Sequence, residues 1–195
     1  MKQDIILAGV GGQGIISIAY VIASAGLEEG LEVKQAEVHG MSQRGGAVES
    51  HLRLADGRIA SDLIPRGGAD LIISVEPLEA LRYFDFLGPS GMVVASRTPF
   101  INIADYPDVA SLTAKIAEAP RHIIVDSEAL AREAGSTRSQ NMVVLGAAST
   151  ELIVREDDLL KFIKALFAPR GESVLAANLK AFALGREAAA ACRKG

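Results

Sequence analysis

The stretch Asp4-Ile5-Ile6-Leu7-Ala8-Gly9-Val10-Gly11-Gly12-Gln13-Gly14-Ile15-Ile16-Ser17 decides the fold of this chain. A short apolar run from Ile5 to Ala8 is followed by four glycines within six positions, and a long apolar segment begins at Ile15. This order is typical of a buried parallel strand, a tight turn and a helix. Glycine tolerates the positive φ of such a turn and lets a ligand approach the backbone. The free N–H groups and the dipole of the helix favour an anion there, most often a phosphate.

The spacing of the glycines allows more than one interpretation. Gly9, Gly11 and Gly14 match the G-x-G-x-x-G pattern of dinucleotide-binding folds. Glu37 follows Gly14 at about the 20-residue distance at which such folds place a ribose-binding carboxylate. A turn that binds nothing, with Glu37 as a solvated residue at a strand end, is the alternative.

The composition of the chain limits its classes of function. Its 195 residues, of which 49% are hydrophobic, suffice for one domain with a sizeable core, taken here as residues 1–195. The net charge of −4 argues against a general nucleic-acid binder, and no apolar run reaches the roughly 18 residues of a membrane span. The single cysteine, Cys192, excludes an internal disulfide and is too few for an iron–sulfur cluster. We therefore expect a cytoplasmic protein without a secretion signal.

The second predicted strand, residues 32–38, is followed by a segment that leaves the ordinary dinucleotide plan. Residues 39–46 contain three glycines and show no helical period where a helix is expected. Residues 47–54 then alternate with period two, Asp56-Gly57 supplies a hairpin turn, and residues 58–64 are predicted to pair back. An antiparallel hairpin is therefore inserted into the sheet.

The segment before this hairpin is a candidate ligand loop. Gln43, Arg44, Gly45 and Gly46 would lie beside the first glycine turn if both loops occupy the carboxyl ends of neighbouring strands. The guanidinium of Arg44, next to two glycines, is suited to an anionic group, because its fork donates several hydrogen bonds. A surface arginine on a loop is the alternative.

The rest of the chain first alternates strands with helices and then becomes helical. Strands are predicted at 69–76, 91–96 and 121–126, with helices at 78–87, 109–119, 127–134, 142–153, 157–167 and 173–191. Asn141 is expected to cap the helix that follows it or to face a bound group. The fold class is therefore α/β: a three-layer, mainly parallel Rossmann-like sheet (1–135) with a helical C-terminal third (136–195).

Several kinds of catalytic site are missing from the sequence. His39, His51 and His122 lie on different predicted elements and lack the spacing of a helical metal pair. The sequence contains no Gly-x-Ser-x-Gly elbow and no Walker segment. We therefore expect neither a metal site nor a complete active site in this chain.

Two motifs together carry a resemblance to a known family. Gly9-Val10-Gly11-Gly12-Gln13-Gly14 and Glu37-Val38-His39-Gly40-Met41-Ser42-Gln43-Arg44-Gly45-Gly46 resemble the gamma-type subunit or domain of 2-oxoacid:ferredoxin oxidoreductases. The second motif is most similar to the small (beta) subunit of indolepyruvate:ferredoxin oxidoreductase. Glu76-Pro77-Leu78-Glu79-Ala80-Leu81-Arg82 and Asn141-Met142-Val143-Val144-Leu145-Gly146 support the resemblance, which covers nearly the whole chain.

The resemblance implies a role within a larger enzyme. Such an enzyme oxidatively decarboxylates a 2-oxoacid on thiamine diphosphate, transfers the acyl group to coenzyme A and passes electrons through iron–sulfur clusters to ferredoxin. Thiamine diphosphate and the clusters would belong to a larger partner subunit. This chain would contribute coenzyme A contacts and assembly, and we expect it to form a homodimer without the partner. The candidate binding residues are Gly9, Gly11, Gly12, Gln13, Gly14, Gln43, Arg44, Gly45, Gly46 and Asn141. An NAD-binding dehydrogenase and a non-catalytic assembly module remain as alternatives.

Overall fold

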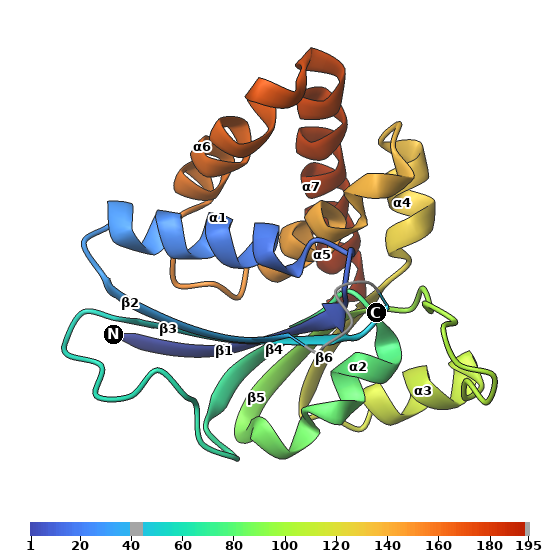
Figure 1. Cartoon of the computed structure of the whole chain (residues 1–195), viewed down its shortest axis with the longest axis horizontal. Coiled ribbons are helices and arrows are strands. Elements are labelled where there is room, and N and C mark those ends of the chain that lie inside the picture. The colour runs from blue at the N-terminus through green and yellow to red at the C-terminus, as the bar shows by residue number, and fades with distance from the viewer. Residues whose placement is uncertain (40–44, 194–195) are drawn as a thin grey trace.

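One sheet organises the computed structural model of the chain, which describes residues 1–39 and 45–193 (Figure 1). In these residues six strands are arranged in the order β2-β3-β1-β4-β5-β6. They are β1 (Lys2–Val10), β2 (Glu32–His39), β3 (Ala47–Ala55), β4 (Ala69–Ser74), β5 (Leu87–Ser96) and β6 (Arg121–Val125). The strands β1, β4, β5 and β6 pair in parallel. The predicted mainly parallel α/β sheet is therefore confirmed.

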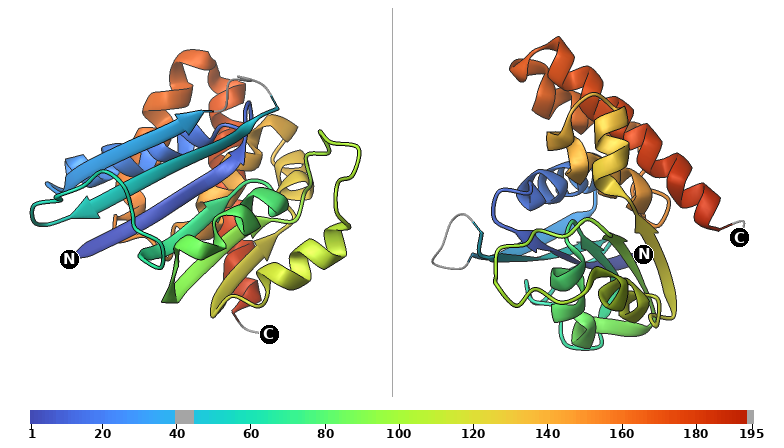
Figure 2. Two further views of the ribbon diagram at one scale, coloured as in Figure 1. Left: turned by 60° about the horizontal axis from the view of Figure 1, so that its bottom comes forward. Right: turned by 90° about the vertical axis from the view of Figure 1, so that its right-hand side faces the viewer.

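The strand β3 departs from the parallel plan. It lies between β1 and β2 and runs antiparallel to both, so that Leu52 stands opposite Ile5 on one side and Gln35 on the other (Figure 2). The antiparallel insertion predicted at residues 47–54 is confirmed. Its predicted partner is wrong, because residues 58–64 form no strand and β3 pairs back onto β2 instead.

The mispredicted pairing of residues 58–64 has a physical reason. Both edges of β3 are occupied by β1 and β2, so no backbone edge remains for residues 58–64. A side chain of β3 holds that segment instead: Arg53 Nη1 donates to the carbonyl oxygens of Ser61 and Leu63 at 2.9 and 3.0 Å. The same guanidinium donates to both carboxylate oxygens of the buried Asp4, at 2.7 and 2.9 Å, which fixes its orientation.

Helices cover both faces of the sheet (Figures 1 and 2). One face carries α1 (Ile15–Glu28), α4 (Ser127–Glu133), α5 (Gln140–Ala148), α6 (Glu156–Phe167) and α7 (Glu172–Cys192), and the other carries α2 (Pro77–Arg82) and α3 (Val109–Ile116). Successive residues of a strand point to opposite faces. Ile5 and Leu7 accordingly belong to the core beneath α1 and α5, whereas Ile6 belongs to the core beneath α2 and α3. The predicted three-layer arrangement is confirmed.

The helical C-terminal third packs closely because two glycines remove side chains from a helix crossing. A Cβ on Gly146 of α5 would lie 2.0 Å from the carbonyl oxygen of Phe182, and one on Gly185 of α7 would lie 2.0 Å from that of Val143. Residues 141–148 are therefore buried, and α5 forms the centre of the helical layer.

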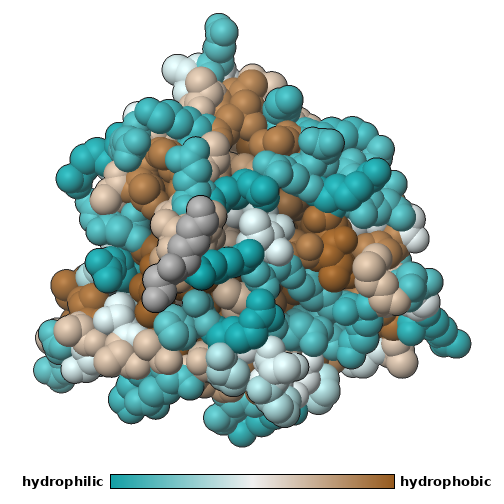
Figure 3. All heavy atoms as spheres, turned by 180° about the vertical axis from the view of Figure 1, so that it is seen from behind, coloured by the Kyte–Doolittle hydropathy of each residue, from teal (hydrophilic) through white to brown (hydrophobic). Residues whose placement is uncertain are grey.

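One face of the molecule is mainly polar. On the face opposite to that of Figure 1, hydrophilic residues cover most of the molecule, and hydrophobic residues form separate patches (Figure 3). Within the described ranges, every helix is too short or too polar to cross a membrane.

Candidate functional site

The glycine loop between β1 and α1 adopts a conformation that requires glycine. Gly12 has φ +101° and Gly14 has φ +81°, both in the left-handed region. A Cβ on Gly14 would also lie 2.4 Å from Asn141 Nδ2. Gln13 closes the turn, because its Oε1 accepts from the N–H of Val10 at 2.8 Å. The N-cap residue of α1 is Gly14 itself, and no side chain caps this helix.

The second predicted ligand loop lies beside the first. The N–H of Gly11 donates to the carbonyl oxygen of Gly46 at 2.8 Å, and the N–H of Gly45 donates to that of Gly11 at 3.4 Å. The predicted juxtaposition is therefore confirmed at these three glycines. Gln43 and Arg44, which were predicted to contribute to the same site, lie outside the described residues.

Asn141 links α5 to the glycine loop. The N-cap position of α5, which begins at Gln140, is Ser139, so the prediction of Asn141 at that position is wrong. Asn141 Oδ1 nevertheless accepts from the N–H of Met142, in the first turn of this helix, at 3.0 Å. The Asn141 amide, 5% exposed, donates from Nδ2 to the carbonyl oxygen of Gly14 at 3.2 Å. This contact holds the start of α1 against the first turn of α5.

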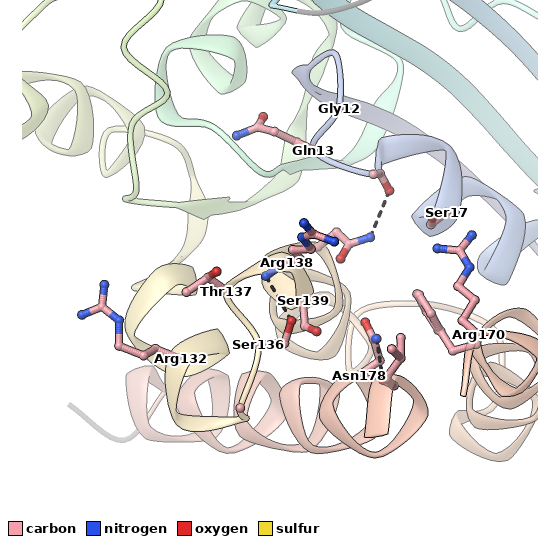
Figure 4. A pocket seen from close by; sticks show the side chains of 15 residues that line it. Gly12, Gln13, Ser17, Arg132, Ser136, Thr137, Arg138, Ser139, Arg170 and Asn178 are labelled. Carbon is pink, nitrogen blue, oxygen red and sulfur yellow. Dashed lines mark hydrogen bonds between the residues drawn. The ribbon is translucent and has the colours of Figure 1, made fainter. Parts of the chain in front are cut away.

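A cleft of about 770 Å³ opens between the glycine loop, the connection from α4 to α5, and the junction of α6 with α7 (Figure 4). We call it the arginine cleft. Its lining residues are Gly12, Gln13, Gly14, Ser17, Arg132, Gly135, Ser136, Thr137, Arg138, Ser139, Asn141, Phe167, Arg170, Val174 and Asn178. Of the predicted site residues, Gly12, Gln13, Gly14 and Asn141 are therefore brought together here. Gly9 is not among them; a Cβ at that position would lie 2.7 Å from Ile15 Cδ1, so this glycine serves packing.

The arginine cleft is electropositive although the whole chain carries a net charge of −4. Three guanidinium groups line it, and neither Asp nor Glu occurs among its described lining residues. Arg132 forms an ion pair with Glu128 at 2.8 Å, and the guanidinium of Arg170 lies 5.2 Å from the ring centre of Phe167. Figure 4 shows Arg138 and Arg170 on different sides of the cleft, with Arg170 next to Ser17. Arg138 and Arg170 lie near the N-terminus of α1, and cationic side chains at a helix N-terminus favour an anionic ligand.

One buried hydroxyl in the arginine cleft is available to such a ligand. Ser139 is 1% exposed, and its Oγ has no hydrogen-bond partner among the described residues. A buried hydroxyl without a partner costs free energy that a ligand oxygen would recover. The donor set of the cleft therefore fits a phosphate-bearing group.

The sequence patterns did not single out most of the residues that give the cleft its charge. Arg132, Arg138 and Ser139 come from the segment after β6, and Arg170 comes from the break between α6 and α7. A polar loop at 135–141 and the break Pro169-Arg170-Gly171 are visible in the sequence, but neither indicates that the two meet at the glycine loop.

The position of Glu37 argues against the dinucleotide interpretation. In that interpretation the strand carrying the carboxylate lies next to β1. Here β3 separates β2 from β1, and Glu37 lines a different groove beside Ile16 and Tyr20. The glycine loop and Glu37 therefore do not form one nucleotide site.

The described residues do not form a cluster of metal ligands. Within residues 1–39 and 45–193, no cluster of three or more His, Cys, Asp or Glu side chains could hold a metal ion.

The fold and the arginine cleft together define an α/β domain with a basic cleft at the carboxyl edge of its sheet. A family model described as pyruvate ferredoxin/flavodoxin oxidoreductase matches residues 4–188. The chain therefore belongs to this family.

Curated relatives agree with this membership. An indolepyruvate oxidoreductase subunit IorB from Archaeoglobus fulgidus is 41% identical over 153 residues, which cover 75% of each chain. The subunit of the same name from Thermococcus kodakarensis is 35% identical over 200 residues, which cover 97% of each chain.

Solved structures share the fold. The 2-oxoglutarate:ferredoxin oxidoreductase from Magnetococcus marinus, with 2-oxoglutarate, coenzyme A and succinyl-CoA bound, aligns with a TM-score of 0.79 and 29% identity. This alignment covers 97% of the present chain and 31% of that longer one. A keto/oxoacid ferredoxin oxidoreductase gamma subunit from Geobacter sulfurreducens aligns with a TM-score of 0.71, and the alignment covers 97% and 99% of the two chains. Its identity of 23% supports the fold alone.

Proposed function

We propose that the arginine cleft binds coenzyme A within an enzyme to which this chain contributes one subunit. The chain is a small subunit of a 2-oxoacid:ferredoxin oxidoreductase, as its family and its relatives at 41% and 35% identity indicate. Our proposal for the reaction is the oxidative decarboxylation of indolepyruvate, or a related aryl-pyruvate, to an acyl-CoA. Support for the substrate comes from the names of these relatives, and support for coenzyme A comes from the Magnetococcus marinus structure.

The remaining cofactors are assigned to a larger partner subunit. One cysteine cannot ligate an iron–sulfur cluster, which needs about four thiolates. We therefore place the clusters and thiamine diphosphate on the partner, which would pass electrons to ferredoxin.

The complete enzyme would work in the cytoplasm. Without its partner the chain would form a homodimer, which a light-scattering mass measurement tests; a monomeric mass contradicts it.

The observation that carries the coenzyme A assignment is a basic cleft, with no Asp or Glu among its described lining residues, at an uncapped helix N-terminus. Coenzyme A, when bound, supplies the thiol that accepts the acyl group. Arg138 and Arg170 would neutralise its phosphates, and the Ser139 hydroxyl would donate to a phosphate oxygen. The absence of side chains at Gly12 and Gly14, which hold a positive φ, would let the backbone approach those phosphates closely. Arg44 is proposed to add a further positive charge from the neighbouring loop.

The assignment is tested in the enzyme reconstituted with its partner. Arg138→Ala should raise the KM for coenzyme A about fivefold, because an exposed guanidinium contributes about 1 kcal/mol to binding a phosphate. The kcat and the KM for the 2-oxoacid should not change. Arg66→Ala is the matched control, because Arg66 pairs with Asp85 at an exposed site and does not line the cleft. An unchanged KM for coenzyme A in Arg138→Ala would remove the proposed role. The same measurement on Arg44→Ala tests that residue.

A purely structural role for the glycine loop makes a different prediction. If the chain only supports assembly, Gly12→Ala should keep full activity and an unchanged KM for coenzyme A once the complex has formed. If the loop holds phosphates, the same variant raises that KM, because alanine resists a φ of +101° and the loop backbone shifts.

A further inference from the structure

A second, smaller cleft lies where α2 and the segment 100–106 meet the end of β1. Its volume is about 200 Å³, and its polar lining residues include Glu76, Glu79, Arg82, Asn102 and Tyr106. We call it the Glu79 cleft. Gly45, which contacts the glycine loop through Gly11, also lines it. The α2 side of the sheet bounds this cleft, whereas the arginine cleft lies on the α1 side.

Glu76 has a structural role in the Glu79 cleft. This residue is 1% exposed and is the N-cap of α2, where its Oε2 accepts from the N–H of Glu79 at 2.8 Å. Its Oε1 accepts from the N–H of Phe100 at 3.3 Å and from the hydroxyl of Tyr106. Both carboxylate oxygens are therefore occupied by donors of the chain itself.

Glu79 differs from Glu76 in having one oxygen without a partner. Its Oε1 accepts from Arg82 Nε at 2.9 Å, whereas its buried Oε2 has no hydrogen-bond partner among the described residues. The whole residue is only 5% exposed. Burial raises the pKa of Glu79, and the nearby Glu76 acts in the same direction. A buried carboxylate oxygen is stabilised either by a proton or by an external donor.

The chemistry around this oxygen selects the kind of donor. Asn102 uses its Nδ2 to donate to the carbonyl oxygen of Gly45 at 2.6 Å. The Asn102 Oδ1 therefore remains an acceptor, in addition to Glu79 Oε2. Two carboxylates in the cleft are matched by only one described cationic side chain, Arg82, so that a single additional positive charge would balance them. No described group of His, Cys, Asp or Glu here could hold a metal ion.

We propose that the Glu79 cleft binds a primary ammonium group, which donates hydrogen bonds to Glu79 Oε2 and Asn102 Oδ1. An ammonium carries one positive charge and three donors, which matches the charge and the acceptors of the cleft. Its source is either a free small amine or a lysine side chain of a partner subunit. The site stands on the contacts of Glu79 and does not depend on the assignment of coenzyme A to the arginine cleft.

In the test, the full chain is titrated with n-butylammonium. Binding is measured by calorimetry and by the carboxyl ¹³C NMR signal of Glu79. Wild type should bind with saturation, and Glu79→Gln should weaken binding roughly tenfold or more, because a charge-assisted hydrogen bond is lost. Ile103→Trp, at the half-exposed rim of the cleft, should block binding while keeping the carboxylate. Tetramethylammonium, which has no N–H group, should not bind at this site.

Asp85→Asn is the matched control, because Asp85 is an exposed carboxylate paired with Arg66 outside the cleft. It should bind n-butylammonium like wild type. The absence of saturable binding to wild type, or equal binding to Glu79→Gln and wild type, overturns the proposal. Such a result would mean that a proton alone satisfies Glu79.

The assembled enzyme distinguishes the two sources of the ammonium group. If n-butylammonium still binds after the partner has been added, a free amine is the ligand. If binding is lost on assembly and Glu79→Gln weakens subunit association, a lysine of the partner is the ligand. Arg138→Ala, which alters the arginine cleft alone, should bind n-butylammonium like wild type, so that failure at this site is separate from failure at the arginine cleft.

Discussion

The arginine cleft and the Glu79 cleft lie near the same edge of one sheet, yet they have opposite chemistry. At the arginine cleft, α1 begins at Gly14 without a side-chain cap, and Arg138 and Arg170 lie near its N-terminus. At the Glu79 cleft, α2 begins at Glu76, whose own carboxylate caps the helix. The cap of α2 satisfies one of the free N–H groups at the helix start and places a carboxylate there, whereas an uncapped N-terminus offers these groups to an external anion. The comparison teaches that capping decides which helix end can receive a ligand.

The largest expected effect is a loss of stability at the crossing of α5 and α7, two helices that both contribute lining residues to the arginine cleft. Gly146→Ala places a Cβ 2.0 Å from the backbone oxygen of Phe182 and forces α5 and α7 apart. We expect a loss of about 3 kcal/mol in the free energy of unfolding, measured by urea denaturation. Gly57→Ala is the control, because a Cβ there meets no atom within 4 Å. A loss equal to that of the control would contradict the close helix crossing.

The next largest effect is expected from a substitution that removes the cap by which α2 differs from α1. Glu76→Ala deletes the N-cap and leaves the donors of Phe100 and Tyr106 unpaired, so we expect a loss of about 2 kcal/mol in unfolding free energy. Asp126→Ala removes only an exposed N-cap bond to Ala129 and should cost about 1 kcal/mol. Equal losses in the two variants would show that Glu76 acts as a cap alone.

The third effect concerns ligand affinity at the uncapped helix. Gly14→Ala should weaken coenzyme A binding roughly tenfold, because one or two charge-assisted hydrogen bonds are misplaced when Asn141 is displaced. Gly12→Ala should have a smaller effect, since its Cβ meets no atom and only the positive φ is disfavoured. Calorimetric titration of the folded variants measures both. Equal effects of the two substitutions would contradict the role of the contact with Asn141, because both positions have a positive φ.

The smallest effect is a pH dependence at the Glu79 cleft. Burial raises the pKa of Glu79 in the folded chain above the ordinary value of 4.5. The folded state therefore binds this proton more tightly than the unfolded state, and its contribution to stability is lost as the pH rises from 4.5 through the raised pKa. Glu79→Gln should gain stability relative to wild type over that interval, measured by urea unfolding at several pH values. A difference that does not change with pH would mean that the pKa is not raised.

Local patterns in the sequence predicted much of the fold but not every pairing. The run Ile5–Ala8 followed by glycines predicted the first strand, turn and helix, because strand and turn preferences act locally. The alternation at 47–54 predicted a strand correctly. Its partner was mispredicted, because alternation reports which face is buried and carries no information about the neighbouring strand.

The residues of the candidate site also divide into those that local sequence patterns predicted and those that they did not. Gly12 and Gly14 were predicted because their spacing follows from the turn itself. Arg138 and Arg170 were not, because they reach the glycine loop only through the packing of helices that are distant in the sequence. Glu79 was noted only as part of the motif Glu76–Arg82, since the burial of one carboxylate oxygen is a property of the folded chain.

Direct titration of the full chain with coenzyme A, with NADH as the competing ligand, tests the central claim. The account predicts that coenzyme A binds, that NADH does not displace it efficiently, and that the double variant Arg138→Ala/Arg170→Ala weakens coenzyme A binding roughly tenfold or more. Tight binding of NADH, or an unchanged affinity for coenzyme A in the double variant, would contradict the assignment of the arginine cleft.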